Sequence, residues 1–113
     1  MSEPMLRAAF WVSAQIKICD LKSIPIVVVK KGDPDAGAVF LKIDRHINGV
    51  VVLSQARDGQ GMRVWTQATG NEPVTSNEAD AYLERQKKYD PDLWIIDIDD
   101  PNDQYQPGEN VRM

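Results

Sequence analysis

The amino-acid sequence predicts an α+β fold: an N-terminal helix, a four-strand antiparallel meander, a second helix and a fifth strand that joins the sheet. Three observations support this prediction. Two stretches show the apolar periodicity of helices, and five short runs rich in Val, Ile and aromatic residues are typical of strands. The first four runs are separated by connections too short to hold a crossover helix, and strands joined in this way run antiparallel.

The first helix is expected from about residue 5 to residue 21, a stretch without internal glycine or proline. Its apolar residues fall on two stripes at helical spacing. One stripe contains Met5, Ala9, Val12, Ile16 and Cys19, and the other contains Trp11, Ala14, Ile18 and Leu21. A helix that packs on one face of a sheet needs only one stripe. The pattern therefore predicts burial on a second side, or a contact with a second chain.

The four strands of the meander are expected at residues 26–31, 38–43, 50–57 and 62–68, separated by turns rich in Gly, Asp and Asn. A second helix is expected from about residue 75, because Thr75 and Glu78 have the spacing of a capping box. The fifth strand, LWIIDI at residues 93–98, has apolar residues at consecutive positions. Such a run predicts a strand inside the sheet, covered on both faces.

Length and composition indicate one domain over residues 1–99, followed by a polar and largely irregular tail at residues 100–113. The chain has 113 residues and a net charge of -4, and residues 90–113 hold seven acidic residues against one basic residue. No apolar run approaches the ~20 residues of a membrane span, so no membrane partner is expected. Cys19 is the only cysteine, which excludes an internal disulfide and is typical of a cytoplasmic protein.

The connection GDPDAG, Gly32 to Gly37, permits two interpretations. It is a hairpin turn in which Pro34 fixes the backbone and Asp33 hydrogen-bonds locally, or it is a binding loop. Two carboxylates help to hold Mg²⁺ only if further oxygen ligands come from elsewhere, so neither a metal site nor a cofactor is predicted. The candidate ligand-binding residues at this connection are Lys30, Lys31, Asp33 and Asp35.

Trp65 is a fifth candidate ligand-binding residue, because its neighbours on the same strand face, Arg63 and Gln67, are polar. It also enters a nucleic-acid hypothesis, in which it stacks on a base beside a basic sheet face made by Lys30, Lys31, Lys42, Arg57 and Arg63. The acidic net charge argues against that partner. The acidic segment at residues 97–103 lacks the spacing of a calcium loop and is expected to be a solvated strand end.

Several stretches resemble a family of small bacterial proteins, chiefly from alphaproteobacteria, that is defined only as a domain of unknown function. The similar stretches are WVSAQI at 11–16, IPIVVVKKGDPDAGAVFLKI at 24–43, VLSQARD at 52–58, AYLERQ at 81–86 and DPDLWIIDI at 90–98. The resemblance implies a bacterial, cytosolic, stand-alone domain. It implies no catalytic activity and carries over no active-site residues.

Three functions are compatible with these patterns. The first is a protein-binding or assembly module that docks on a protein partner, or on itself as a homodimer, through the sheet face or the first helix. The second is a small-ligand or divalent-metal-dependent enzyme domain that uses the connection at residues 32–37. The third is weak nucleic-acid binding. No catalytic residue is identified, so the sequence favours a binding role over an enzymatic one.

Overall fold

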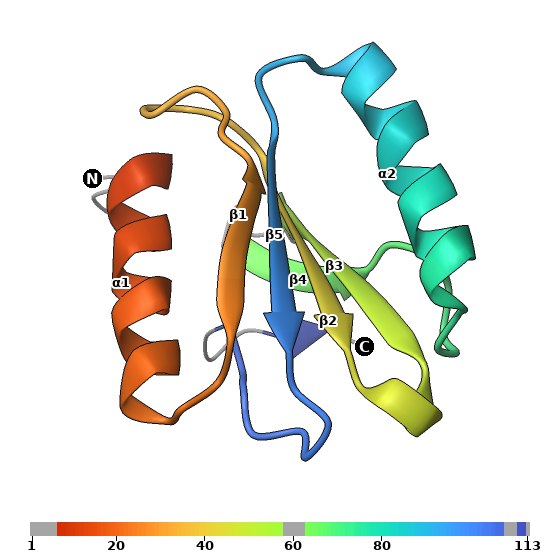
Figure 1. Ribbon diagram of the computed structural model, residues 1–113. Helices are drawn as coiled ribbons and strands as arrows, with labels where there is room; N and C mark the ends of the chain where they lie inside the picture. The colour runs from red at the N-terminus through yellow and green to blue at the C-terminus, as the bar shows by residue number, and fades with distance from the viewer. Residues whose placement is uncertain (1–6, 58–62, 108–110, 113) are drawn as a thin grey trace.

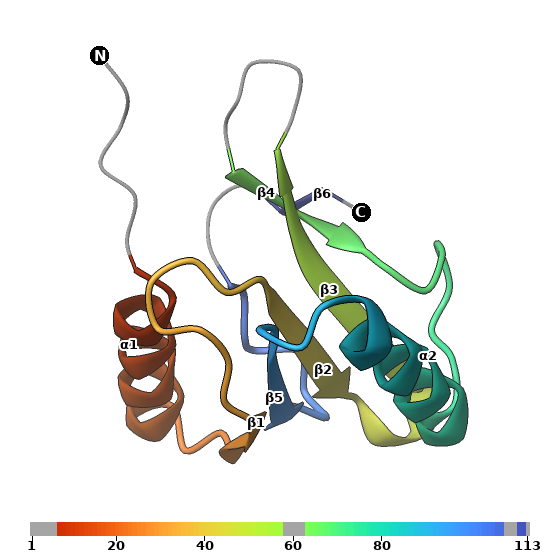
Figure 2. The same ribbon diagram turned by 90° about the horizontal axis from the view of Figure 1, so that it is seen from above.

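The computed structural model describes residues 7–57, 63–107 and 111–112, which form three layers. One sheet lies between helix α1 (Ala8–Leu21) and helix α2 (Ser76–Tyr89). Figures 1 and 2 show one helix on each face of the sheet. The predicted α+β class is confirmed, as is the chain order of a helix, four strands, a second helix and a fifth strand.

The described sheet has six strands of unequal length. They are β1 (Ile26–Lys30), β2 (Val39–Asp44), β3 (Val50–Arg57), β4 (Arg63–Gln67), β5 (Trp94–Asp99) and the short β6 (Val111–Arg112). Their spatial order is β1-β5-β2-β3-β4-β6. The antiparallel pairing of β2 with β3 and of β3 with β4 is as predicted. However, β5 is parallel to β2, and β6 is parallel to β4, so the sheet is mixed.

The predicted pairing of the first two strands is wrong. β5 lies between β1 and β2, antiparallel to the first and parallel to the second. Strands β1 and β2 do run in opposite directions, as the short connection requires. That connection, residues 31–38, only has to span two strand spacings, about 10 Å, which a few extended residues cover. The interior position predicted for the fifth strand, β5, is confirmed.

Each face of the sheet has its own apolar core, because successive side chains of a strand point to opposite faces. On the α1 side, Val12 and Cys19 belong to a cluster with Leu41, Ile43, Ile96 and Ile98. On the α2 side, Ala79 and Leu83 belong to a cluster with Phe40, Val52, Leu93 and Ile95. β2 and β5 contribute to both clusters, which explains why the run LWII has no polar position.

The segment after β5 also contributes to the core. Asp100 is buried, and its carboxylate accepts hydrogen bonds from the backbone N–H groups of Gln104 and Tyr105, both at 2.9 Å. The Tyr105 side chain is 1% exposed, and its hydroxyl donates to Gln15 Oε1 in α1 at 2.7 Å. Residues 101–107 are irregular, but the packed unit extends through Tyr105.

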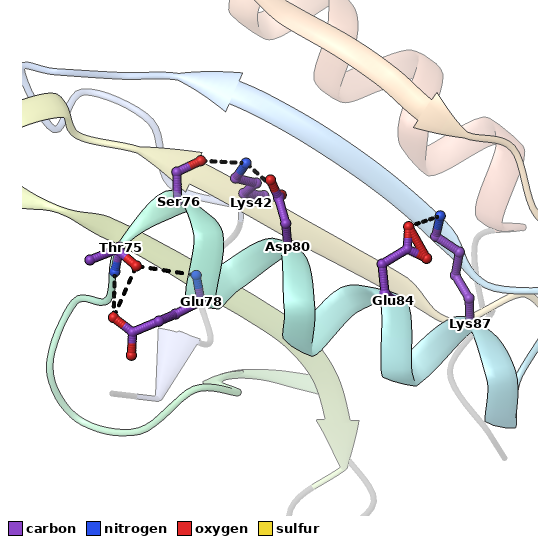
Figure 3. A network of polar contacts seen from close by, with 7 residues as sticks. All are labelled: Lys42, Thr75, Ser76, Glu78, Asp80, Glu84 and Lys87. Atoms are coloured by element: carbon purple, nitrogen blue, oxygen red, sulfur yellow. Dashed lines mark hydrogen bonds and ion pairs between the residues drawn. The ribbon is translucent and has the colours of Figure 1, made fainter.

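The start of α2 is determined by its own sequence. The Thr75 hydroxyl accepts from the Glu78 N–H at 3.1 Å, and the Glu78 carboxylate accepts from the Thr75 N–H at 3.2 Å (Figure 3). This confirms the predicted capping box. Lys87 and Lys88 lie in the last turn, where positive charge suits the helix dipole.

The start of α1 depends on a distant segment instead. No side chain caps this helix. The N–H groups of Ala8 and Ala9 donate to the carbonyl oxygens of Asp35 and Pro34, at 3.3 and 2.9 Å. The first turn of α1 is therefore completed by the connection at residues 31–38. Within the described residues, no helix is long and apolar enough to cross a membrane.

Candidate functional site

The connection at residues 31–38 crosses the beginning of β5 in close contact with its backbone. The Asp33 N–H donates to the Asp92 carbonyl at 2.9 Å, and the Trp94 indole N–H donates to the Asp33 carbonyl at 2.8 Å. A Cβ atom on Gly32 would lie 2.2 Å from the Asp92 oxygen, and one on Gly37 would lie 2.5 Å from the same atom. Both glycines are required because the two backbones approach too closely for a side chain.

The polar side chains of this connection are largely engaged within the chain. Asp33 Oδ2 accepts from the N–H groups of Asp35 and Ala36, at 3.2 and 2.7 Å. Lys30 Nζ donates to the carbonyl oxygens of Pro91 and Leu93, at 2.6 and 3.0 Å. Among the residues that the structure describes, no group of His, Cys, Asp and Glu could hold a metal ion. The engaged polar atoms indicate a structural role for the connection.

The other two predicted residues of this connection, Asp35 and Lys31, are exposed. Asp35 Oδ1 lies 3.5 Å from Arg7 Nε, and both side chains are mostly in solvent. An exposed ion pair of this kind contributes about 0–1 kcal/mol. Lys30, Lys31, Asp33 and Asp35 are thus brought together by the connection itself, but without the converging free groups of a ligand site.

Trp65 lies apart from that connection, on the α1 face of β4. Its side chain is 5% exposed, and its ring centroid is 5.1 Å from that of Trp11. Lys42 lies on the opposite face of the sheet, under α2. Trp65 and Lys42 therefore do not share the basic, aromatic face that the nucleic-acid hypothesis places on the sheet. The polar neighbours of Trp65 are misleading because the α1 face of β4 is covered by a helix.

Lys42 is the centre of a polar network between β2 and α2 (Figure 3). Its Nζ donates to Ser76 Oγ at 3.0 Å and to Asp80 Oδ1 at 2.7 Å. Some hydrolases use a serine nucleophile beside a lysine base. Here the Lys42 amine forms an ion pair with Asp80, and an ion-paired ammonium cannot accept the serine proton. The network instead attaches α2 to the sheet.

Asp97 lies beside Lys42 on the α2 face, because Lys42 is paired in register with Asp97 of β5. Its side chain is half-buried, and within the described residues its carboxylate accepts no hydrogen bond. Burial raises the pKa of Asp97; Lys42 lowers it, whereas Asp80 and Asp44 raise it further. The expectation of a solvated strand end therefore does not hold for this carboxylate.

An acidic pair lies two residues further along the same two strands, on the same face of the sheet. Asp44 of β2 is in register with Asp99 of β5. His46 Nε2 contacts Asp99 Oδ1, and this hydrogen bond raises the pKa of His46. Asp97, Asp44 and Asp99 together form an acidic strip on the α2 face, at the ends of β2 and β5.

β1 presents a free edge next to this strip. It lies at one end of the sheet, and no other described strand pairs with its outer side (Figures 1 and 2). The Asp99 N–H donates to the Pro25 carbonyl at 2.9 Å, and Val27 is in register with Asp97. Bonded and non-bonded pairs alternate in an antiparallel ladder, so the N–H and C=O groups of Ile26 and Val28 point outward.

The side chains of β1 alternate in burial. Ile26 and Val28 pack on the α1 side of the sheet, whereas Val27 and Val29 are 60% and 55% exposed. The run IVVV is typical of a strand buried on both faces, so the sequence does not indicate that Val27 and Val29 are exposed. β1 is an edge strand because β5 pairs with only one of its sides. The sequence of residues 26–30 does not indicate this position.

The outer surface of α1 is a second exposed apolar feature. The predicted second stripe is split, because Trp11 packs against the core while Ile18 and Leu21 are exposed. Phe10, which belongs to neither predicted stripe, is also exposed. Phe10 and Leu21 are 11 residues apart, about 16 Å along the helix axis. The exposed ridge is therefore long and narrow.

Comparison with known proteins identifies the relatives of this fold. A family model described as "Protein of unknown function (DUF1491)" matches residues 6–106. The crystal structure of a DUF1491 family protein from Caulobacter crescentus CB15 is 32% identical, with a TM-score of 0.83, and the similarity covers 97% of this chain and 100% of that chain. No curated protein matches the sequence.

Two structures determined in solution are also similar. The NMR structure of a DUF1491 family protein from Caulobacter crescentus CB15 is 33% identical, has a TM-score of 0.84 and covers 98% of this chain and 100% of that chain. Protein Atu0922 from A. tumefaciens is 25% identical, with a TM-score of 0.71, over 83% of this chain and 85% of that chain. The resemblance noted from the sequence is confirmed, and the chain belongs to the DUF1491 family.

Proposed function

We propose that this chain is a protein-binding module that takes up an extended segment of a partner at the free edge of β1. The observation that carries the proposal is the outward-pointing backbone of Ile26 and Val28 beside the exposed side chains of Val27 and Val29. An added strand satisfies such backbone groups, and the side chains of the edge then contribute specificity.

Natural sheets usually protect a free edge, for example with charged side chains, proline or a covering segment. In the described structure β1 has this protection mainly at its ends, where exposed Lys31 follows the strand and the register with β5 shifts between Val28 and Lys30. Lys30 is its one charged residue, and its ammonium is held by the Pro91 and Leu93 carbonyls rather than displayed at the edge. Pro25 precedes the strand. Between these ends, residues 26–29 carry no charge, and an uncharged, valine-rich edge is the type of surface on which strands assemble.

The ridge of α1 competes with β1 for this role. Single apolar side chains are common on protein surfaces and require no partner. Phe10 and Leu21 lie at opposite ends of the helix, and all described backbone groups between them are part of a helix. β1, in contrast, combines apolar side chains with unpaired backbone groups. The ligand or divalent-ion function at residues 32–37 has less support, because Lys30 and Asp33 are already engaged.

The test compares two matched double variants. Val27→Lys with Val29→Lys places two charges on the β1 edge, and Phe10→Lys with Leu21→Lys places two charges on α1. All four replaced side chains are exposed, so both variants are expected to fold. Each tagged protein is used to capture partners from cells of its source, and captured proteins are quantified by mass spectrometry against the wild type.

We expect the wild-type partners to be lost from the β1 variant and retained by the α1 variant. Retention by the β1 variant, or loss only from the α1 variant, contradicts the proposal. Light scattering gives the molar mass of the purified proteins and so tests whether a second copy of the chain is one of the partners. A cytoplasmic location, expected from the single cysteine, stays a prediction.

A further inference from the structure

The free edge of β1 has a charged neighbour that restricts the chemistry of its partner. Val27, Asp97 and Lys42 form one row across three adjacent strands. All three side chains are on the α2 face: Val27 and Asp97 lie between residues of the α1-side core, and Lys42 contacts α2. The Lys42 ammonium is directed to Ser76 and Asp80. Among the residues that the structure describes, no group donates a hydrogen bond to the Asp97 carboxylate, and exposed Val27 lies between Asp97 and the edge.

We infer that the partner segment is basic, with an arginine or lysine opposite Val27 whose cation pairs with Asp97. The inference rests on the proposed function and names the chemistry of the segment that β1 binds. The partner is an extended stretch of another protein in which basic residues alternate with apolar ones.

The geometry of strand pairing supports this assignment. An antiparallel partner strand hydrogen-bonds to the outward groups of Ile26 and Val28, so its residue opposite Val27 occupies a non-hydrogen-bonded position. Facing side chains are closest at such positions. The partner strand lies two strand spacings from β5, about 10 Å. A long basic side chain can lay its aliphatic stem on Val27 and extend its charged end to the Asp97 carboxylate.

Charge in the surroundings favours the same chemistry. Asp44 and Asp99 continue the acidic strip two residues further along β2 and β5, and His46 balances only Asp99. Burial raises the pKa of Asp97 even though the neighbouring Lys42 lowers it, so a further cation at this carboxylate would offset part of the cost of its burial. An acidic segment would meet repulsion here. A second copy pairing symmetrically about Val27 would place Val27 opposite Val27, which brings no additional cation to Asp97.

The probe is a short, fluorescently labelled synthetic peptide in which arginine alternates with valine, with both ends blocked. In an extended strand all of its arginines fall on one face. A matched peptide carries glutamine in place of each arginine. Affinities are measured by fluorescence anisotropy for the wild type, for Asp97→Asn and for Asp20→Asn. The last variant removes the same charge from an exposed position of α1, and circular dichroism confirms that each variant is folded.

We expect the arginine peptide to bind the wild type and to lose about tenfold in affinity with Asp97→Asn, the size of one charge-assisted hydrogen bond. Asp20→Asn should match the wild type, and the glutamine peptide should bind weakly to all three proteins. Equal affinity for wild type and Asp97→Asn, or no binding of the arginine peptide, overturns the inference.

Two further outcomes separate this inference from the proposed function. If light scattering shows a dimer that Val27→Lys with Val29→Lys dissociates, a second copy occupies the edge; the basic-segment inference then fails while the proposed function holds. If the arginine peptide binds the wild type and that double variant equally, binding does not occur at the β1 edge, and both proposals fail.

Discussion

The two connections that flank β2 use similar residues for different tasks. Residues 31–38 carry Gly32 and Gly37, cross β5 and complete the first turn of α1. The connection between β2 and β3 contains the short 3₁₀ helix His46–Asn48 and links two strands that are hydrogen-bonded neighbours. It is mostly exposed. The first connection therefore packs its backbone against a distant strand, whereas the second is a turn between neighbouring strands whose distant contacts are made by the side chains of Arg45 and His46.

The difference shows that a short connection fixes strand direction but not strand neighbours. Both connections reverse the chain, yet only the first leaves room for another strand. That strand, β5, arrives more than fifty residues later. Its insertion places Asp97 directly beside Val27, which is the arrangement on which the proposed partner surface rests. The candidate partner surface thus depends on the crossing at residues 31–38.

Among the substitutions compared below, Gly37→Ala is expected to have the largest effect. Its Cβ would lie 2.5 Å from the Asp92 oxygen, 2.8 Å from the Asp33 oxygen and 2.9 Å from Trp94 Cδ1. Two of these atoms are backbone and cannot turn aside, so we expect a loss of about 3 kcal/mol in the free energy of unfolding. Urea denaturation followed by tryptophan fluorescence measures it. A loss no larger than that of Gly49→Ala would contradict the distinction between the two connections.

Gly49→Ala is expected to cost less, about 2 kcal/mol, for a different reason. Gly49 has a φ of 89°, a backbone angle that residues with a side chain rarely adopt. An added Cβ would also lie 2.6 Å from Pro73 Cβ. The surrounding turn is exposed and has more freedom to adjust. The same denaturation measurement applies, with Ile47→Ala as a control, because the Ile47 side chain is 98% exposed and its loss should change stability by less than about 0.5 kcal/mol.

A smaller effect isolates the hydrogen bond between Trp94 and the crossing connection. Trp94→Phe removes the donor to the Asp33 carbonyl together with part of a buried ring. Trp65→Phe removes a similar part of a buried ring from a tryptophan that makes no hydrogen bond with its indole in the described structure. We expect Trp94→Phe to destabilise the protein by about 1 kcal/mol more than Trp65→Phe. Equal losses would mean that the indole N–H does not secure the crossing.

The turn between β2 and β3 provides the smallest effect, and it depends on pH. The hydrogen bond to Asp99 raises the pKa of His46. The stabilisation from this pair is therefore complete below the ordinary histidine pKa of about 6.5 and is lost as pH rises through the raised value. The difference in melting temperature between wild type and His46→Gln should be larger near pH 6 than in alkaline buffer. A difference that grows with rising pH would contradict this assignment.

The sequence predicts local features of this fold well. Thr75 and Glu78 form their capping box because every atom of that motif lies within one helical turn, and LWIIDI predicts its interior position because both its faces are apolar. The strand order is not predictable in the same way, because no residue of β1 or β2 indicates that β5 lies between them.

The candidate site shows the same limit. Asp33 and Lys30 resemble site residues in the sequence, but their partners are backbone atoms of Asp35, Ala36, Pro91 and Leu93. The polar neighbours of Trp65 in the sequence predict an exposed residue, but Trp11 of α1 packs against its ring. Val27 and Asp97, 70 residues apart, become neighbours only through tertiary structure.

Amide hydrogen exchange of β1 in the purified protein tests the central claim most directly. If the outer side of β1 is unoccupied, the N–H groups of Ile26 and Val28 exchange rapidly, while that of Val27, which faces β5, is protected. Addition of the arginine peptide should then slow exchange at Ile26 and Val28. Strong protection of these two amides in the protein alone would show that the edge is already covered, and would contradict the account.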